Sequence, residues 1–252
     1  MSEEEQKRKG TPYEVLLERF KAKVAMIPPE CHEAIMLWHI ARRVQEARIA
    51  TENQLGQVLK LGKKVFWADE ELPDAIKAVM VSGAGKSGKG VAHLDNLHKQ
   101  EMAAIRACEK SFKQTRWYSE VAIAAAEGQG LGPMIAGGLL WTIGNTTRFP
   151  SFGRIVKYAR LDVQNGKAPK RRKGEEATGN GYLQRTLYVL SEVWNKMPES
   201  TWRAQWDAHK AVYAEKDPEL TKGHIHNMAR RKVQREFLRN LYNLWNQYST
   251  EE

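Results

Sequence analysis

The sequence predicts an all-α protein, or nearly so, built as a helical bundle with a long N-terminal helical region and a C-terminal domain. Apolar residues recur at three- and four-residue steps through most of the chain, which is the period of an amphipathic helix. Glycine and proline separate these stretches, and no convincing alternation of polar and apolar residues indicates a strand. We expect a disordered tail over 1–10, a helical region over 11–82, a glycine-rich linker over 83–90 and a domain over 91–252.

The N-terminal region is predicted to contain two helices. Thr11 as N-cap, Pro12 at the first helical position and Glu14 completing a capping box mark the start of the first helix. The Pro28–Pro29 pair ends it and opens the second, which carries apolar residues at helical spacing over 30–60. This long amphipathic helix either packs within the monomer or forms a coiled-coil seam between two copies of the chain.

The elements of the C-terminal domain follow one another with short connections. Helices are expected over about 91–113, 119–127, 133–143, 151–159 and 182–196, in a tryptophan-rich stretch around 202–206, and over about 228–248. A basic, glycine-containing loop is expected over 162–181.

The most specific local feature is Gly130-Leu131-Gly132-Pro133, which lies between two predicted helices. Glycine suits a turn with positive φ, or a place where a side chain would block a phosphate, and proline suits the first position of a helix. Leu131 would fill the space between the helices, so the pattern is typical of a helix-hairpin-helix. Backbone amides of Gly130, Leu131, Gly132 and Met134 would then face outward as phosphate donors. The alternative is a helical turn that binds no ligand.

Positive charge is concentrated in the C-terminal half of the chain. The net charge is +10, of which residues 151–173 contribute about +7 and residues 222–239 about +5. Such clustering favours a polyphosphate partner, although solvated helix faces would show it too. The basic residues expected to contact phosphate are Arg148, Arg154, Lys157, Lys167, Lys170, Arg171, Arg172, Lys173, Arg231 and Arg235.

Several other kinds of site are not supported. Gly83 to Lys89 satisfies the pattern GxxxxGK, but Gly90 stands where a Mg²⁺-binding hydroxyl is required, which favours a linker. Histidines and acidic residues show no metal-ligand or nuclease spacing, so no metal, cofactor or catalytic residue is assigned. Cys31 and Cys108 match no metal or redox spacing and are expected to be buried thiols in a reducing compartment.

The sequence also favours a cytoplasmic protein, nuclear if the source is eukaryotic. No apolar run approaches the ~18–20 residues that cross a bilayer. The charged N-terminus has no apolar segment behind it that would indicate a signal peptide. No membrane partner is therefore expected.

Residues 128–161 read GQGLGPMIAGGLLWTIGNTTRFPSFGRIVKYARL. This stretch resembles the C-terminal transposase domain of the Piv/MooV-type family, which comprises DNA invertases and insertion-sequence transposases, including bridge-RNA-guided recombinases. The similarity continues through Gly166 to GNGYLQRTLY over 179–188, where the family carries a glycine followed by Leu-Arg-Arg-x-Leu. It spans roughly residues 120–195, and it implies a helical scaffold that holds DNA.

Two catalytic parts of that family are not found here. Its members carry a RuvC-like domain with acidic residues on a strand, and no such segment is expected in these residues. In the family a serine acts as the DNA-linking nucleophile, yet the corresponding stretch over 163–173 contains no serine or threonine. The resemblance therefore implies a transposase-derived DNA-binding protein without catalysis.

Two alternatives remain open from the sequence. Ser151 and Thr178 flank the basic loop, which leaves room for an active recombinase or nuclease whose site a partner chain completes. Phosphate contacts also do not distinguish DNA from RNA, so the chain could be a ribonucleoprotein subunit. Trp194, Trp202 and Trp206 could stack on bases in that case, although their spacing is more typical of a core.

Overall fold

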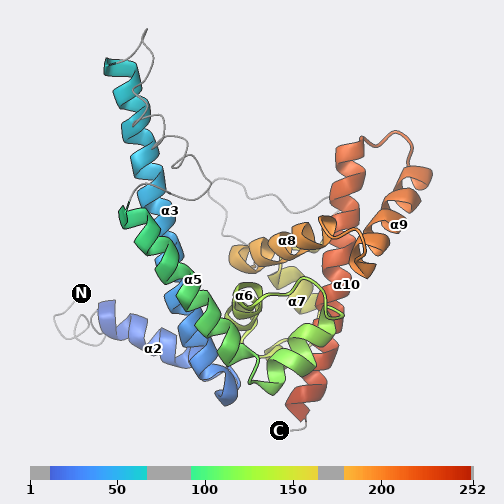
Figure 1. The fold of residues 1–252 in the computed structure, drawn as a ribbon. Helices are drawn as coiled ribbons and strands as arrows, with labels where there is room; N and C mark the ends of the chain where they lie inside the picture. The colour runs from blue at the N-terminus through green and yellow to red at the C-terminus, as the bar shows by residue number, and fades with distance from the viewer. Residues whose placement is uncertain (1–11, 67–91, 164–178, 251–252) are drawn as a thin grey trace, which may run out of the picture. The chain divides into compact units, whose positions relative to one another are not determined.

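The structure is a computed structural model that describes residues 12–66, 92–163 and 179–250 (Figure 1). All regular secondary structure in these residues is helical, which confirms the all-α prediction. The α-helices are α2 (Pro12–Val24), α3 (His32–Phe66), α5 (Ala92–Phe112), α6 (Pro133–Ile143), α7 (Phe152–Tyr158), α8 (Gly181–Asn195), α9 (Thr201–Lys216) and α10 (Lys222–Thr250). Shorter turns are η1 (Pro29–Cys31), the π-helical η2 (Trp117–Ile123) and η3 (Thr146–Arg148). No helix in the described ranges is both long and apolar enough to cross a membrane.

The chain divides into two compact units, which differ from the domain boundaries expected from sequence. Unit 1 contains residues 1–32 and 112–252, and unit 2 contains residues 33–111. The predicted division instead placed a linker at 83–90, which lies outside the described residues. The N-terminal helix belongs to unit 1 because α2 packs on α6, where Phe20 contacts the Trp141 ring at 5.5 Å between centroids.

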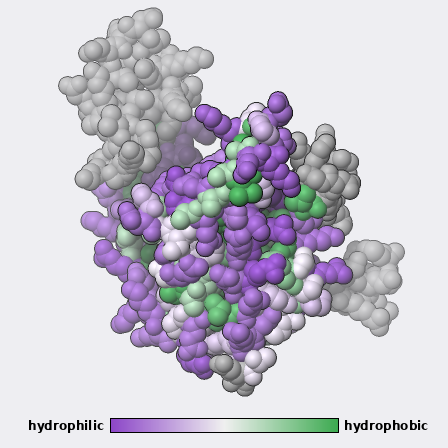
Figure 2. All heavy atoms as spheres, turned by 90° about the vertical axis from the view of Figure 1, so that its right-hand side faces the viewer, coloured by the Kyte–Doolittle hydropathy of each residue, from purple (hydrophilic) through white to green (hydrophobic). Residues whose placement is uncertain are grey.

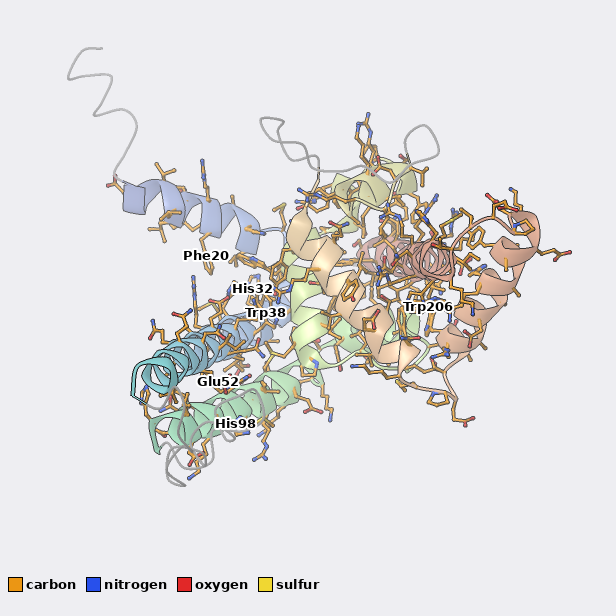
Figure 3. The ribbon with its side chains drawn as sticks, turned by 90° about the horizontal axis from the view of Figure 1, so that it is seen from above. Phe20, His32, Trp38, Glu52, His98 and Trp206 are labelled. Carbon is orange, nitrogen blue, oxygen red and sulfur yellow. The ribbon has the colours of Figure 1, made fainter. Side chains whose placement is uncertain are left out.

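Unit 2 contains two long helices that run antiparallel, α3 and α5 (Figures 1 and 3). The Cys108 thiol lies 3.8 Å from the Ala34 carbonyl oxygen near one end, and Gln45 Nε2 donates to Glu101 at 3.0 Å farther along. Glu101 is buried and also accepts from Arg48, so an ion pair holds the register of the two helices. The face of α3 that carries Ile35, Trp38 and Ala41 is thus buried within a single chain.

Unit 1 is built around α10, which packs against α7, α8, α9, η2 and η3. Its core is rich in tryptophan. Trp194 stacks on Trp202 at 4.8 Å between ring centroids, and Trp117 meets Trp245 edge-on at 5.0 Å. Trp194, Trp202 and Trp206 are all buried, which confirms that they belong to the core rather than to a base-stacking surface. Burial of these large rings stabilises this unit.

Glu30 lies far away in the sequence, yet its side chain caps the N-terminus of the helix that contains η2. Its carboxylate accepts hydrogen bonds from the backbone amides of Arg116 (3.3 Å) and Trp117 (2.7 Å). The same carboxylate accepts from the Tyr248 hydroxyl at 3.0 Å. An acidic side chain at a helix N-terminus satisfies free amides and interacts favourably with the helix dipole, so Glu30 ties η2 to α10.

The last helix is longer than the sequence indicated. It begins at Lys222 rather than near Met228, and Thr221 Oγ1 accepts from the His224 amide at 3.3 Å at its start. The first turns carry little apolar surface, which is why periodicity placed the start too late. Helix α10 is therefore extended at its start by six residues, or less than two turns, and it packs against α9.

Candidate nucleic-acid interface

A tight turn joins the helix containing η2 to α6. Glu127, Gly128 and Gly130 take positive φ values of 53°, 74° and 70°. Gly132 instead has φ of −83° and extended backbone at the N-cap of α6, so only Gly130 of the two predicted glycines needs the left-handed region. Pro133 occupies the first helical position, as expected from the sequence.

Two tryptophan side chains from α8 and α9 hold this turn. The Trp194 indole donates to the Gln129 carbonyl oxygen and the Trp202 indole donates to the Ala126 carbonyl oxygen, each at 3.0 Å. The Gln129 side chain accepts from the Ser200 hydroxyl at 2.6 Å. Local sequence patterns do not indicate these contacts, because the partners lie 65 to 76 residues apart. The turn is thus fixed by the core of unit 1.

Three consecutive amides of the turn have no hydrogen-bond partner in the described part of the chain. They belong to Gly130, Leu131 and Gly132, at the positive end of α6. Leu131 is buried, and its carbonyl accepts from the Tyr118 hydroxyl at 3.1 Å, so its side chain is internal as expected. Free amides in a rigid turn at a helix N-terminus are suited to binding an anion.

An open groove of about 450 Å³ lies over α7 in the same unit. Its walls combine apolar or aromatic surface with three basic side chains. The lining residues are Arg148, Phe149, Pro150, Arg154, Lys157, Tyr158 and Gly179. The structure therefore brings three of the predicted basic residues to one concave surface.

Arg148 is held in place by its neighbours. Its guanidinium carbon lies 4.6 Å from the centroid of the Phe149 ring and 4.9 Å from that of Tyr158. The Thr142 carbonyl accepts from Arg148 Nη2 at 3.4 Å and from the Tyr158 hydroxyl at 3.2 Å. Arg148 nevertheless remains exposed to solvent. Its guanidinium is thus a fixed, planar and accessible cation.

The basic side chains of the groove lack acidic partners. Within the described residues, Arg148, Arg154 and Lys157 form no ion pair, in contrast to the paired Arg116 and Arg203. Lys23 lies beside them, with its amine 4.4 Å from the Trp141 ring centroid. Burial, and secondarily the nearby Arg148 charge, lowers the pKa of Lys23. This region therefore holds uncompensated positive charge.

Hydrogen bonds join the residues just before the predicted basic loop to residues near its end. The backbone N–H of Asn180 donates to the Tyr158 carbonyl oxygen at 2.6 Å, and Arg160 Nη2 donates to the Gly179 carbonyl oxygen at 3.3 Å. A Cβ on Gly179 would lie only 2.6 Å from the Tyr158 carbonyl oxygen, so this arrangement requires glycine. The predicted loop residues themselves lie outside the described residues. They are Lys167, Lys170, Arg171, Arg172 and Lys173.

The two arginines predicted on α10 have different surroundings. Arg231 is partly buried, and its Nη2 donates to the carbonyls of Arg160 and Asp162 at 3.0 Å each. Burial lowers the pKa of its guanidinium. Arg231 therefore supports the start of the basic loop, whereas Arg235 is partly exposed and forms no ion pair within the described residues.

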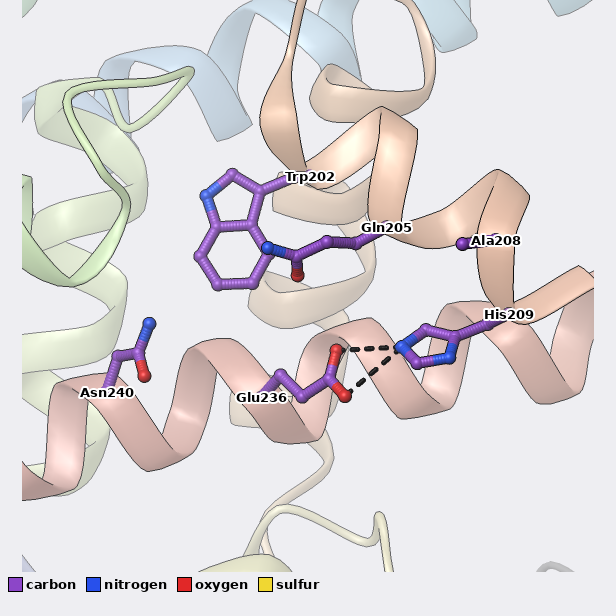
Figure 4. Close-up of a pocket in the computed structure, with 6 residues that line it drawn as sticks. All are labelled: Trp202, Gln205, Ala208, His209, Glu236 and Asn240. Carbon is purple, nitrogen blue, oxygen red and sulfur yellow. Dashed lines mark hydrogen bonds and ion pairs between the residues drawn. The ribbon is translucent and has the colours of Figure 1, made fainter.

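A second pocket, of about 390 Å³, lies between α9 and α10 (Figure 4). His209 Nε2 contacts both carboxylate oxygens of Glu236, at 2.9 and 3.1 Å. Its other lining residues are Trp202, Gln205, Ala208 and Asn240, and none of them carries a hydroxyl or thiol nucleophile. The pair thus joins two helices.

The face of the molecule drawn in Figure 2 is mostly hydrophilic, with small and separate apolar patches.

Residues 125–207 match the transposase IS116/IS110/IS902 family.

The chain carries a transposase-like domain. The match begins just before the turn and contains α6, the groove over α7, α8 and the first part of α9. It does not extend to α10 or to unit 2. No curated protein and no solved structure matches the chain significantly.

Proposed function

We propose that the protein is a transposase-related DNA-binding protein that grips the phosphate backbone without catalysing strand cleavage. The contacts would come from the helix-hairpin-helix over 116–143 and from the basic loop over 162–181. The observation that carries this proposal is the set of free amides at Gly130, Leu131 and Gly132, held rigid by Trp194 and Trp202 inside the transposase-like span. Contacts of this kind fix the position of a protein on DNA and carry little sequence information.

The distribution of charge supports the same conclusion. The groove over α7 adds three basic side chains without acidic partners in the described residues. Gly179, which lies within the predicted basic loop, also lines the groove. Neutralising several phosphates releases condensed counterions, which makes clustered charge an effective source of affinity.

The non-catalytic part of the proposal rests on residue types. The stretch over 163–173 contains no serine or threonine to act as a nucleophile. In the described ranges, no three histidine, cysteine or acidic side chains are grouped so that they could hold a metal ion. Nicking of supercoiled DNA in the presence of Mg²⁺, or a covalent protein–DNA adduct, would overturn this part.

The binding proposal is tested by neutralising the basic loop. We expect replacement of Lys170, Arg171, Arg172 and Lys173 by glutamine to weaken duplex binding and flatten its salt dependence. Each lost phosphate contact lowers the slope of log K against log salt by about 0.9, so four contacts would lower it by about 3 to 4. Fluorescence anisotropy with a labelled duplex over a salt series measures both quantities.

A matched variant controls for net charge. Replacing four exposed basic residues elsewhere by glutamine removes the same net charge. We expect this variant to change the slope of log K against log salt much less than the loop variant does. These positions are Lys99, Arg106, Lys110 and Lys216. Unchanged binding by the loop variant would contradict the proposal, and tighter binding to RNA than to duplex DNA would assign the contacts to RNA.

A further inference from the structure

The groove over α7 has features that a duplex phosphate contact does not require. Protruding cations suffice to hold a duplex backbone, since the phosphates lie on the outside of the helix. Here the cations surround a concavity of about 450 Å³ whose wall includes Phe149, Pro150 and Tyr158. That volume falls in the range of sites for single small molecules, roughly 300–1,000 Å³. The groove thus has the size and lining of a site for one nucleotide.

The centre of this site is the Arg148 guanidinium. The Phe149 and Tyr158 rings are neighbours, 5.3 Å apart between centroids, and together they support the guanidinium plane. Arg148 remains exposed to solvent despite these contacts. Unpaired bases stack on arginine planes as well as on aromatic rings, and such stacking tolerates any base.

The positive charge around the groove favours binding of an anion. Burial, and secondarily the charge of Arg148, lowers the pKa of Lys23, and neither side chain forms an ion pair within the described residues. Arg154 and Lys157 add two further cations to the groove, again without described acidic partners. A bound phosphate would relieve this repulsion, and one nucleotide supplies the phosphate and the base together.

We propose that the groove over α7 holds one unpaired DNA nucleotide, with its base stacked on Arg148 and its phosphate on Arg154 and Lys157. This inference rests on the proposed DNA-binding function and specifies the form of DNA. The protein would accordingly prefer DNA that offers a splayed nucleotide, as at a flap or a junction, over continuous duplex.

The test compares two DNA ligands on the full chain. One is a duplex, and the other is the same duplex with a short single-stranded flap that contains 2-aminopurine. We expect the flapped DNA to bind about 5- to 10-fold more tightly, which is the order of one base-stacking contact. Binding should also quench the 2-aminopurine fluorescence, because quenching reports stacking of that base.

Conservative substitutions separate stacking from charge. Arg148→Lys keeps the charge and removes the plane, so the ratio of flap to duplex affinity should fall to about one and the quenching should disappear. Arg185→Lys makes the same exchange at an exposed position of α8 outside the groove and should leave both readouts unchanged. Circular dichroism compares the folding of the variants, and the quenching in the unmodified protein decides the matter even if Arg148→Lys misfolds.

The possible failures are distinguishable. Equal affinity for flap and duplex, without quenching, would overturn the nucleotide site and leave the duplex-binding proposal standing. Failure to bind either DNA would overturn both proposals. Tighter binding of an RNA flap than of the DNA flap, with the same sensitivity to Arg148→Lys, would overturn the assignment to DNA.

Discussion

The glycines of the turn between η2 and α6 differ in what each position demands. Gly128 has φ of 74°, and a Cβ there would meet no atom within 4 Å. Gly130 has φ of 70°, and its Cβ would lie 2.9 Å from Val193 Cγ1. Gly132 has an ordinary φ and open space around it. Substitution at Gly128 would therefore cause backbone strain alone, substitution at Gly130 would cause both strain and a steric clash, and substitution at Gly132 would cause neither.

Alanine substitutions at these positions should form a graded series. We expect Gly132→Ala to cost about 0.5 kcal/mol, because alanine is a poorer N-cap residue than glycine, and Gly128→Ala to cost about 1 kcal/mol through the left-handed backbone. Gly130→Ala should cost about 2–3 kcal/mol, because the clash with Val193 adds to the strain. Urea denaturation measures all three, and a flat series would contradict the observed turn geometry.

Cys108 is a buried thiol, as the sequence indicated. Burial, together with the charge of Glu109, raises its pKa from the ordinary value of 9.0 to about 12. The folded protein therefore keeps the thiol proton more tightly than the unfolded chain does. The stability linked to this group is complete below pH 9 and is lost as the pH rises toward 12.

This linkage predicts a pH-dependent difference between two proteins. Above pH 9, the free energy of unfolding should fall more steeply in the unmodified protein than in Cys108→Ala, by up to about 1.4 kcal/mol per pH unit. Urea denaturation at a series of pH values measures both slopes. The variant is expected to be less stable at neutral pH because of its cavity, so only the slopes are compared, and parallel slopes would disprove the shift.

At the scale of elements, Asn180 joins the start of α8 to Tyr158 at the end of α7. Its Oδ1 accepts from the amides of Tyr182 (2.9 Å) and Leu183 (3.0 Å), and its Nδ2 donates to the Tyr158 hydroxyl at 2.8 Å. The sequence placed the helix start near Tyr182 but did not identify this cap, which depends on the position of α7. One side chain thus orders both a helix end and a loop end.

Asn180→Ala should therefore destabilise the protein by about 1–2 kcal/mol, the usual cost of losing an N-cap. Asn180→Asp keeps the accepting oxygen and should recover most of that loss. Chemical denaturation gives the two free energies. If both variants lost the same amount, the cap at Tyr182 and Leu183 would not be the stabilising contact.

At the scale of the whole molecule, unit 2 is an insertion between two parts of unit 1. Its chain leaves through α3 and returns through α5, and the contact between Cys108 and Ala34 keeps the two ends of the insertion adjacent. Both clusters of excess positive charge, over 151–173 and 222–239, lie in unit 1. Folding of unit 1 and its affinity for DNA should therefore depend little on most of unit 2.

A deletion tests this independence. Replacing residues 44–102 by a short glycine-rich loop should leave a folded helical protein whose duplex affinity is within a few-fold of the full chain. Circular dichroism and fluorescence anisotropy measure the two properties. A folded protein that had lost most of its affinity would show that unit 2 contributes to binding.

Much of the fold followed from local patterns, but little of the site geometry did. Helix α6 was predicted at its observed bounds, and Pro133 marks its start. The start of α10 was missed because its first turns have little apolar surface. Arg148 was named as a basic residue, yet nothing near it in the sequence indicated the support of Phe149 and Tyr158.

The sequence by itself determined the all-α class, the positions of most helices, the glycine turn at 130–132 and the concentration of positive charge. These properties depend on residues within a few turns of each other, so periodicity and composition reveal them. Tertiary structure alone decided that Trp194 and Trp202 hold the turn, that Glu30 caps η2 and that Arg231 supports a loop. Each of these contacts joins groups at least 65 residues apart, and packing of the helices brings them together.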